Sequence, residues 1–231
     1  MKVAISMRQE TDKHGSDGSI LEDAYVDYLQ RFGIILYPVP NTIQDVDLYL
    51  KEAGIEGVIL SGGNDVDPHS YGGKRKEGLS LALKRDEVEK AMIDYALKLE
   101  IPLLGICRGM QFLNVYYGGK IIDFKENNIA HPVGKEHHHS VEIQNEQGFF
   151  GKKTIIKTTI NSYHNQGLTE KELSSALLSF AVSTEGIIEG FYHPALPIVG
   201  IQWHPERSSP DKEFNRKLVS AFVTKKFYWK K

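Results

Sequence analysis

The sequence predicts an α/β fold with a mainly parallel central sheet flanked by helices and a small antiparallel addition. Apolar runs that suit buried strands alternate with stretches of helical periodicity over roughly the first 120 residues. Two of these runs, 58–60 and 103–106, lead into turns that contain glycine. Strands separated by helices of this length pair in parallel through right-handed crossovers. With 231 residues, we expect a single domain, 1–231.

The predicted elements of the first part follow one another regularly. Residues 2–6, 34–39 and 58–60 read as buried strands, and an amphipathic helix is predicted over 20–32. The clearest helical pattern covers 85–100, where apolar side chains share one face and charged side chains share the other. Pro102 ends that pattern, and Leu103–Ile106 follows as a buried strand.

Beyond residue 120 the predicted strands are shorter. Residues 140–143, 153–158 and 181–183 have strand-like patterns. Residues 187–192 and 198–203 resemble an antiparallel pair, and a last helix is predicted over 212–222. These strands account for the antiparallel addition to the sheet.

Composition excludes several classes of protein. A net charge of -2 gives no reason to expect nucleic acid or an anionic membrane as partner. No apolar run approaches the ~18 residues that a membrane span requires, and the N-terminus lacks the apolar core of a signal peptide. We therefore expect a cytoplasmic protein. The single cysteine forms no internal disulfide, so it is either an inert core residue or a reactive thiol.

That cysteine lies in the segment GICRGMQ, residues 105–111. Gly105 and Gly109 stand two positions before and after Cys107, between a buried strand and a stretch of helical spacing. This is the pattern of a nucleophile elbow, whose tight packing leaves no room for side chains at those two positions. The helix N-terminus would stabilise a thiolate and offer backbone N–H groups to an oxyanion. The alternative is a packed cysteine in a glycine-rich turn.

A thiol nucleophile needs a base, and His204 is the best candidate. It ends a predicted buried strand, and Glu206 follows after one proline, where it can orient the imidazole ring. The run 137–139 of three histidines is a weaker candidate for a metal site. Adjacent side chains on a strand point to opposite faces, and no cysteine or close carboxylate completes a ligand set. We therefore expect no metal and no cofactor.

Taken together, GICRGMQ and the later WHPE at 203–206 resemble the class I glutamine amidotransferase-like superfamily, with its Cys-His-Glu triad. The segments SGGNDVDP at 61–68, Arg85-Asp86 and NSYHNQG at 161–167 narrow the resemblance to the γ-glutamyl hydrolase branch, which is peptidase C26-like. The resemblance implies flavodoxin-like layering. It also implies a γ-glutamyl amide hydrolase that forms a γ-glutamyl thioester.

The same resemblance implies roles for individual residues. Cys107 would attack the γ-amide carbon, His204 would shuttle the proton and Glu206 would orient His204. The backbone N–H groups of Gly63 and Arg108 would form the oxyanion hole. The residues expected to hold the glutamyl head group, in part through their backbone, are Gln111, Ser162, Tyr163 and His164.

The leaving group is less constrained by the sequence. The short segment 127–142 and the end WHPERSSP look closer to relatives in surface or capsule polysaccharide pathways, including those that cleave a γ-glutamyl nucleotide phosphoramidate of the γ-glutamyl-CDP-amidate type. γ-Glutamyl-γ-aminobutyrate stays open as a substrate. Arg8, just after the first strand, is the candidate that would bind an anionic leaving group.

Two other classes of function stay open at this point. A glutaminase subunit would deliver ammonia to a separate synthetase partner, and a redox-sensing thiol protein would have no enzymatic activity. The sequence also leaves open a homodimer.

Overall fold

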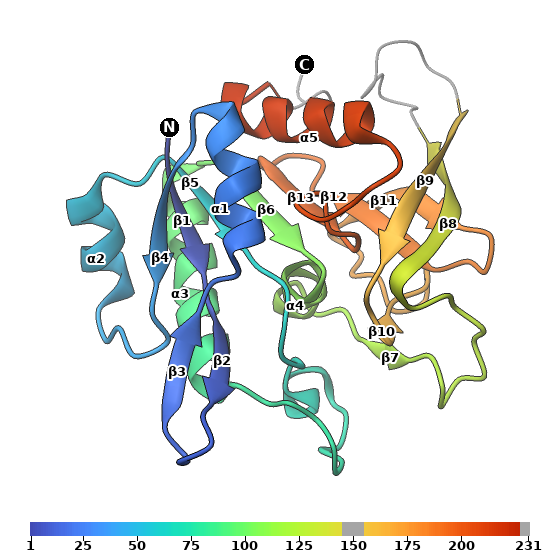
Figure 1. Cartoon of the computed structure of the whole chain (residues 1–231), viewed down its shortest axis with the longest axis horizontal. Helices are drawn as coiled ribbons and strands as arrows, with labels where there is room; N and C mark the ends of the chain where they lie inside the picture. Colours follow the sequence, from blue (N-terminus) through green and yellow to red (C-terminus); the bar gives the residue numbers. More distant parts are fainter. Residues whose placement is uncertain (145–154, 227–231) are drawn as a thin grey trace.

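The computed structural model describes residues 1–144 and 155–226, and a nine-stranded sheet runs through it (Figure 1). Five neighbouring strands are parallel, in the order β4 (Ile35–Val39), β1 (Lys2–Ser6), β5 (Gly57–Leu60), β6 (Leu103–Ile106) and β13 (Ile198–Ile201). The sheet continues antiparallel through β12 (Ile188–Tyr192), β11 (Leu178–Ser183), β8 (Gly134–Gln144) and β9 (Ile155–Ser162). The predicted α/β class with a parallel centre is confirmed.

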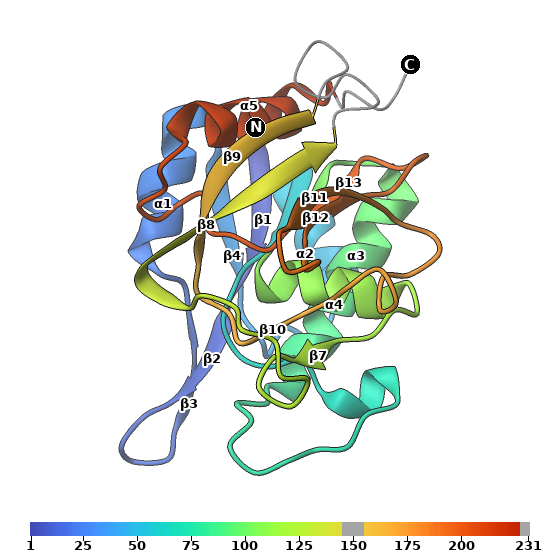
Figure 2. The same cartoon turned by 90° about the vertical axis from the view of Figure 1, so that its right-hand side faces the viewer.

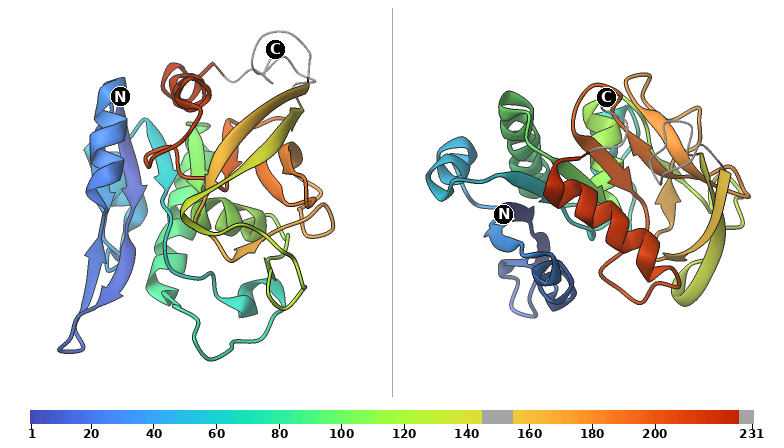
Figure 3. Two further views of the ribbon diagram at one scale, coloured as in Figure 1. Left: turned by 45° about the vertical axis from the view of Figure 1, so that its right-hand side comes forward. Right: turned by 90° about the horizontal axis from the view of Figure 1, so that it is seen from above.

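Helices cover both faces of the parallel half. Seen from above in Figure 3, α1 (Asp23–Leu29) and α5 (Lys212–Thr224) lie on one side. The other side carries α2 (Val46–Ala53), α3 (Leu83–Leu99) and α4 (Arg108–Tyr116). Each layer has its own apolar core: Leu29 and Phe222 belong to the first, and Leu50 and Met92 to the second. This two-sided burial explains why the central strands read as continuous apolar runs.

Smaller elements gather beyond the carboxyl ends of the parallel strands. The hairpin of β2 (Arg8–Thr11) and β3 (Asp17–Ile20) projects there, as does the segment that carries the 3-10 turn Pro68–Tyr71 (Figure 2). The short pair β7 (Ile122–Asp123) and β10 (Gln166–Gly167) lies at the same end. Open α/β sheets bind ligands outside this edge, so these elements surround the expected site.

The sequence placed one helix too early and missed two elements. The helix predicted over 20–32 begins at Asp23, because Ile20 pairs with Arg8 in the β2–β3 hairpin and Glu22 is extended, with φ -68° and ψ 135°. It ends in a 3-10 turn, Gln30–Phe32. The hairpin itself and α2 were not predicted. The hairpin strands are short and largely exposed, so they lack the alternating apolar pattern that predicts a strand.

The later strands agree better with prediction. β12 and β13 are antiparallel neighbours, as expected. The segment 140–143 lies within β8, and 181–183 ends β11. Of the strand predicted over 153–158, residues 155–158 lie in β9, and 153–154 lie outside the described residues. Within the ranges that the structure describes, no helix is long and apolar enough to cross a membrane.

Candidate active site

Cys107 occupies a sharp turn between β6 and α4. Its backbone has φ 52° and ψ -108°, a left-handed conformation that costs of order 1–3 kcal/mol for a residue with a side chain. A Cβ at Gly105 would lie 2.7 Å from the carbonyl of Gly109, and one at Gly109 would collide with the carbonyl oxygen of Leu60. The glycines on both sides of Cys107 are therefore required by packing, as the elbow pattern predicted.

His204 follows β13 and lies beside Cys107. A Cβ added to Gly62 would be 2.8 Å from His204 Cε1 and 3.5 Å from Cys107 Cβ, so all three residues meet at one point. On its other side, Nδ1 of His204 is 2.5 Å from Oε1 of Glu206. Burial alone lowers the pKa of His204, but the charges of Glu206 and Cys107, with hydrogen bonds to both, raise that pKa to about 10. A protonated His204 in this position stabilises a thiolate.

Asn161 holds the backbone of His204, and sequence reasoning missed it as a positioning residue. Its Oδ1 accepts a hydrogen bond from the His204 N–H at 2.9 Å, and its Nδ2 donates to the His204 carbonyl at 2.8 Å. Asn161 is fully buried at the end of β9. It is the first residue of the NSYHNQG segment, which was the available signal.

The turn Ser61-Gly62-Gly63 faces Cys107 from the end of β5. Gly63 has φ 98°, a conformation that favours glycine. The fully buried Arg85 donates to the carbonyl oxygens of Ser61 at 2.7 Å and Gly62 at 3.0 Å. Because both carbonyls are bound by Arg85, the turn is fixed in one orientation. Within the described residues, the N–H of Gly63 makes no hydrogen bond, which leaves it available to a ligand.

A buried ion network continues from Arg85 to the elbow. Nε of Arg85 is 2.8 Å from Oε1 of Glu89, and Arg108 pairs with both Glu89 and Asp86. Burial lowers the pKa of Arg85 to about 10, and burial together with the charge of Arg85 lowers that of Arg108 to about 9, so both stay charged at neutral pH. The Arg108 side chain is thus committed to α3, and its backbone N–H is the group left for the site.

A cavity of about 390 Å³ opens above Cys107. Gln111 lies in its wall, where its Nε2 donates to the Gln166 carbonyl at 2.9 Å. The Tyr163 ring packs edge-on against His204, with 5.5 Å between ring centroids. Ser162 is fully buried and is not among the cavity-lining residues; its Oγ lies 3.1 Å from Nε2 of His131. Other predicted site residues that line the cavity are Arg8, Gly63, Arg108, His164 and His204.

The family model for peptidase C26 matches residues 2–206. The chain belongs to the peptidase C26 family. The chain is 36% identical to the γ-glutamyl-CDP-amidate hydrolase of Campylobacter jejuni over 172 residues, covering 74% of this chain and 72% of that protein. It is 29% identical to the γ-glutamyl-γ-aminobutyrate hydrolase PuuD of Escherichia coli over 222 residues, covering 88% and 85% of the two chains.

Solved structures show the same fold. A glutamine amidotransferase of Thermotoga maritima superposes with a TM-score of 0.59 at 17% identity. The superposition covers 97% of this chain and 83% of that one. At this identity the likeness concerns the fold, and the peptidase C26 assignment rests on the family model.

In this C26 chain the cavity mouth carries two arginines. Arg8 emerges after β1, as expected, and its Nη1 lies 3.1 Å from Oε1 of Glu22. Arg207 was missed by sequence reasoning; its Nη2 lies 2.8 Å from Oε2 of the same Glu22 carboxylate. Its guanidinium also stacks over Tyr163, 4.6 Å from the ring centroid. Glu22 therefore lies between two cations at the entrance.

A histidine cluster lies behind the cavity wall. His139 Nε2 is 3.2 Å from Oε1 of the fully buried Glu189, so the expectation that no carboxylate is close to the histidine run is wrong. Within the run, His137 and His138 are exposed and His139 is buried, so one of the three rings reaches the interior. Burial lowers the pKa of His164 to about 3, and burial and the charge of His164 lower that of His131 to about 4. Both rings are neutral at neutral pH.

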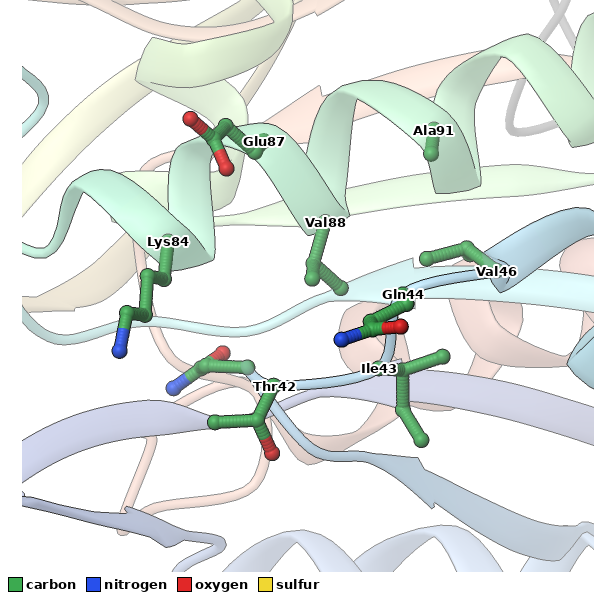
Figure 4. Close-up of a pocket in the computed structure, with 9 residues that line it drawn as sticks. Thr42, Ile43, Gln44, Val46, Lys84, Glu87, Val88 and Ala91 are labelled. Atoms are coloured by element: carbon green, nitrogen blue, oxygen red, sulfur yellow. The ribbon is translucent and has the colours of Figure 1, made fainter.

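A second cavity, of about 510 Å³, lies between α3 and the segment after β4 (Figure 4). Thr42 and Gln44 line one side, and Lys84 and Glu87 line the other. It contains none of the predicted site residues. Cys107 and His204 both line the cavity above Cys107 and are not among the residues that line this second one.

The ion network predicts a large effect of Glu89→Gln on stability. This change leaves Arg85 and Arg108 buried without their shared counter-charge, which typically costs about 3–5 kcal/mol. Urea unfolding should show a loss of that size in the free energy of unfolding. Glu87→Gln, an exposed change on the same helix, is the control and should stay within about 0.5 kcal/mol of wild type. Equal stability of the two variants would contradict the prediction.

Proposed function

We propose that the protein hydrolyses a γ-glutamyl amide through a γ-glutamyl thioester on Cys107. The observation that carries the proposal is the line from Cys107 to His204 to Glu206 in a chain of the peptidase C26 family: Cys107 and His204 line the cavity, and Glu206 lies behind His204. Two relatives named as γ-glutamyl hydrolases support the substrate class. The raised pKa of His204 supports a thiolate–imidazolium pair as the reactive form.

In the first half of the reaction, the Cys107 thiolate attacks the γ-carbonyl carbon and forms a carbon–sulfur bond. The negative charge moves to the carbonyl oxygen, where the N–H groups of Gly63 and Arg108 donate hydrogen bonds. His204 then donates its proton to the leaving nitrogen. The carbon–nitrogen bond breaks, and the amine or amidate is released.

In the second half, neutral His204 takes a proton from water as the water oxygen attacks the thioester carbon. The carbon–sulfur bond breaks, glutamate leaves and the thiolate is restored. Glu206 stabilises the imidazolium at each stage and holds the ring tautomer. Gln111 and the backbone around Tyr163 and His164 hold the glutamyl head group. The chain's own residues supply every step.

For the leaving group, we propose an anion that reaches Arg8 and Arg207. A nucleotide phosphoramidate of the γ-glutamyl-CDP-amidate type presents phosphate oxygens, and γ-glutamyl-γ-aminobutyrate presents a carboxylate; a guanidinium binds either. The phosphoramidate would place the enzyme in a cytoplasmic pathway toward surface or capsule polysaccharide.

The direct test is glutamate release from a panel of three compounds. The panel contains γ-glutamyl-CDP-amidate, γ-glutamyl-γ-aminobutyrate and glutamine. We expect the highest kcat/KM for an anionic substrate. Activity on glutamine alone, rising when a synthetase is added, would instead favour the ammonia-delivering subunit. No turnover of any compound, with reversible oxidation of the thiol, would favour the redox-sensing protein.

Substitution of the nucleophile and the base should abolish hydrolysis. Cys107→Ala and His204→Asn each remove one member of a unit, so the double variant should be no slower than the slower single variant. Initial rates of glutamate release by the purified variants measure this. His14 is exposed, so His14→Asn is the matched control and should leave the rate unchanged. Cys107→Ala with a rate within tenfold of wild type would contradict the mechanism.

The thioester should accumulate at low pH. Glu206 raises the pKa of His204, so the neutral form that activates water falls about tenfold per pH unit below that pKa. The thioester lacks the Cys107 charge, so below the pKa that His204 has in that state deacylation should slow by at most about tenfold per pH unit. Intact-mass analysis after rapid quenching should detect a glutamyl adduct on Cys107. Glu206→Gln should form the adduct more slowly, and absence of any adduct at all quench times would favour direct attack by water.

Arg8→Ala should separate anionic substrates from glutamine. A hydrogen bond to a charged group contributes about 1.5–3 kcal/mol, and the low end applies because the Arg8 side chain is 34% exposed and also pairs with glutamates. We expect KM for the anionic substrate to rise about tenfold and glutamine hydrolysis to change little. Arg31→Ala, at an exposed position, is the control. Equal losses on both substrates would indicate a structural role for Arg8.

A further inference from the structure

Four side chains from separate segments converge behind the wall of the active-site cavity. His131 precedes β8, His139 lies on β8, His164 follows β9 and Glu189 lies on β12. All four side chains are nearly or fully buried. Bringing three imidazoles and a carboxylate together in the interior has a cost in desolvation, so their contacts require a physical explanation.

The ligand atoms of His131, His139 and Glu189 all lie within 4.8 Å of one another, and His164 borders this group of three. Nε2 of His131 lies 3.3 Å from Nε2 of His164, and Nε2 of His139 lies 3.2 Å from Oε1 of Glu189. The remaining close approaches are 3.7 Å, from His131 Nε2 to Glu189 Oε1, and 3.8 Å, from His164 Nε2 to Glu189 Oε2. Neighbouring ligands of a tetrahedral zinc ion, bound at ~2.0–2.1 Å, are separated by roughly 3.3 Å.

Hydrogen bonds among these groups leave the carboxylate incompletely satisfied. Glu189 is fully buried, and its Oε2 has no hydrogen-bond partner among the described residues. The same is true of Nδ1 of His131 and of His139. A buried carboxylate without a matching cation is costly, and a divalent ion would offset that cost.

His164 is already held in the form that binds metals. Its Nδ1 lies 3.0 Å from the backbone carbonyl oxygen of Gln166, so Nδ1 carries the proton and donates it, and Nε2 presents its lone pair to the cluster. A histidine ligand that donates its second N–H to a backbone carbonyl is typical of metal sites. The Ser162 hydroxyl, 3.1 Å from Nε2 of His131, is the competing partner within the protein.

We propose that His131, His139, His164 and Glu189 bind one divalent metal ion of the zinc class, as a structural site separate from the Cys107 chemistry. His131, His139 and Glu189 supply two imidazole nitrogens and one carboxylate oxygen, and His164 would move toward them to complete a tetrahedral donor set that suits Zn²⁺. The ion would join the segment before β8 to β8, β12 and the loop after β9. That loop leads into β10, where the carbonyl of Gln166 accepts a hydrogen bond from Gln111 in the cavity wall.

The test uses protein without a histidine tag, in a Cys107→Ala background that removes the thiol as a competing ligand. After dialysis against a chelator, titration with ZnCl₂ by calorimetry should show one saturable site, and Zn²⁺ should raise the melting temperature. Glu189→Gln and His139→Asn should weaken binding by more than the roughly 10- to 100-fold that loss of an outer-shell partner costs. His138→Asn, the exposed neighbour on the same strand, should bind Zn²⁺ like the parent.

Several outcomes would overturn the proposal. These are the absence of saturable binding, unchanged binding in Glu189→Gln, and loss of binding in His138→Asn. If the cluster variants fail to fold, Co²⁺ is added to the Cys107→Ala protein instead. Strong visible absorption bands would indicate four-coordinate nitrogen and oxygen ligation, as the proposal expects. Weak bands, typical of a six-coordinate ion, would overturn the assignment. None of these measurements depends on γ-glutamyl hydrolysis.

Discussion

The buried ion network of Arg85, Glu89, Arg108 and Asp86 is the constraint on which the parallel half of the site depends. Arg85 binds the carbonyls of the Ser61-Gly62-Gly63 turn, and Arg108 is the first residue of the helix behind Cys107. Glu89 on α3 pairs with both arginines. Because buried charges are stable only when all are paired, a shift of the turn or the elbow would leave one charge unpaired. The network thereby holds the backbone N–H groups of Gly63 and Arg108 in fixed positions.

The antiparallel half of the sheet positions His204. His204 leaves the sheet at β13, where parallel and antiparallel pairing meet, and Asn161 at the end of β9 fixes its backbone from the far edge of the sheet. Cys107 comes from β6, the neighbour of β13. Cys107 and His204, the proposed nucleophile and base, therefore follow adjacent strands but are positioned by opposite halves of the molecule. Four antiparallel strands extend the sheet on the side of His204.

Features with local signals could be predicted, and features that depend on distant partners could not. The elbow at Cys107 was predictable because packing demands glycines at fixed offsets, and the order of strands and helices followed from periodicity. The approach of Glu189 to His139 had no such signal, since 50 residues separate them and the contact depends on sheet order. Arg207 was passed over because its neighbour Glu206 already explained the segment.

The shared position of Glu22 between Arg8 and Arg207 determines how an anionic leaving group can be selected. An incoming phosphate or carboxylate does not meet free cations; it replaces, or shares, contacts that the Glu22 carboxylate already makes at 3.1 and 2.8 Å. The net gain in binding free energy is therefore the difference between the new ion pair with the ligand and the existing ion pair with Glu22. At a part-exposed position this difference is smaller than either ion-pair energy. A phosphate carries more charge and more acceptor oxygens than a carboxylate, so it competes better with Glu22 for both arginines. Under the proposed function, this arrangement would therefore favour a phosphate-bearing leaving group over γ-aminobutyrate.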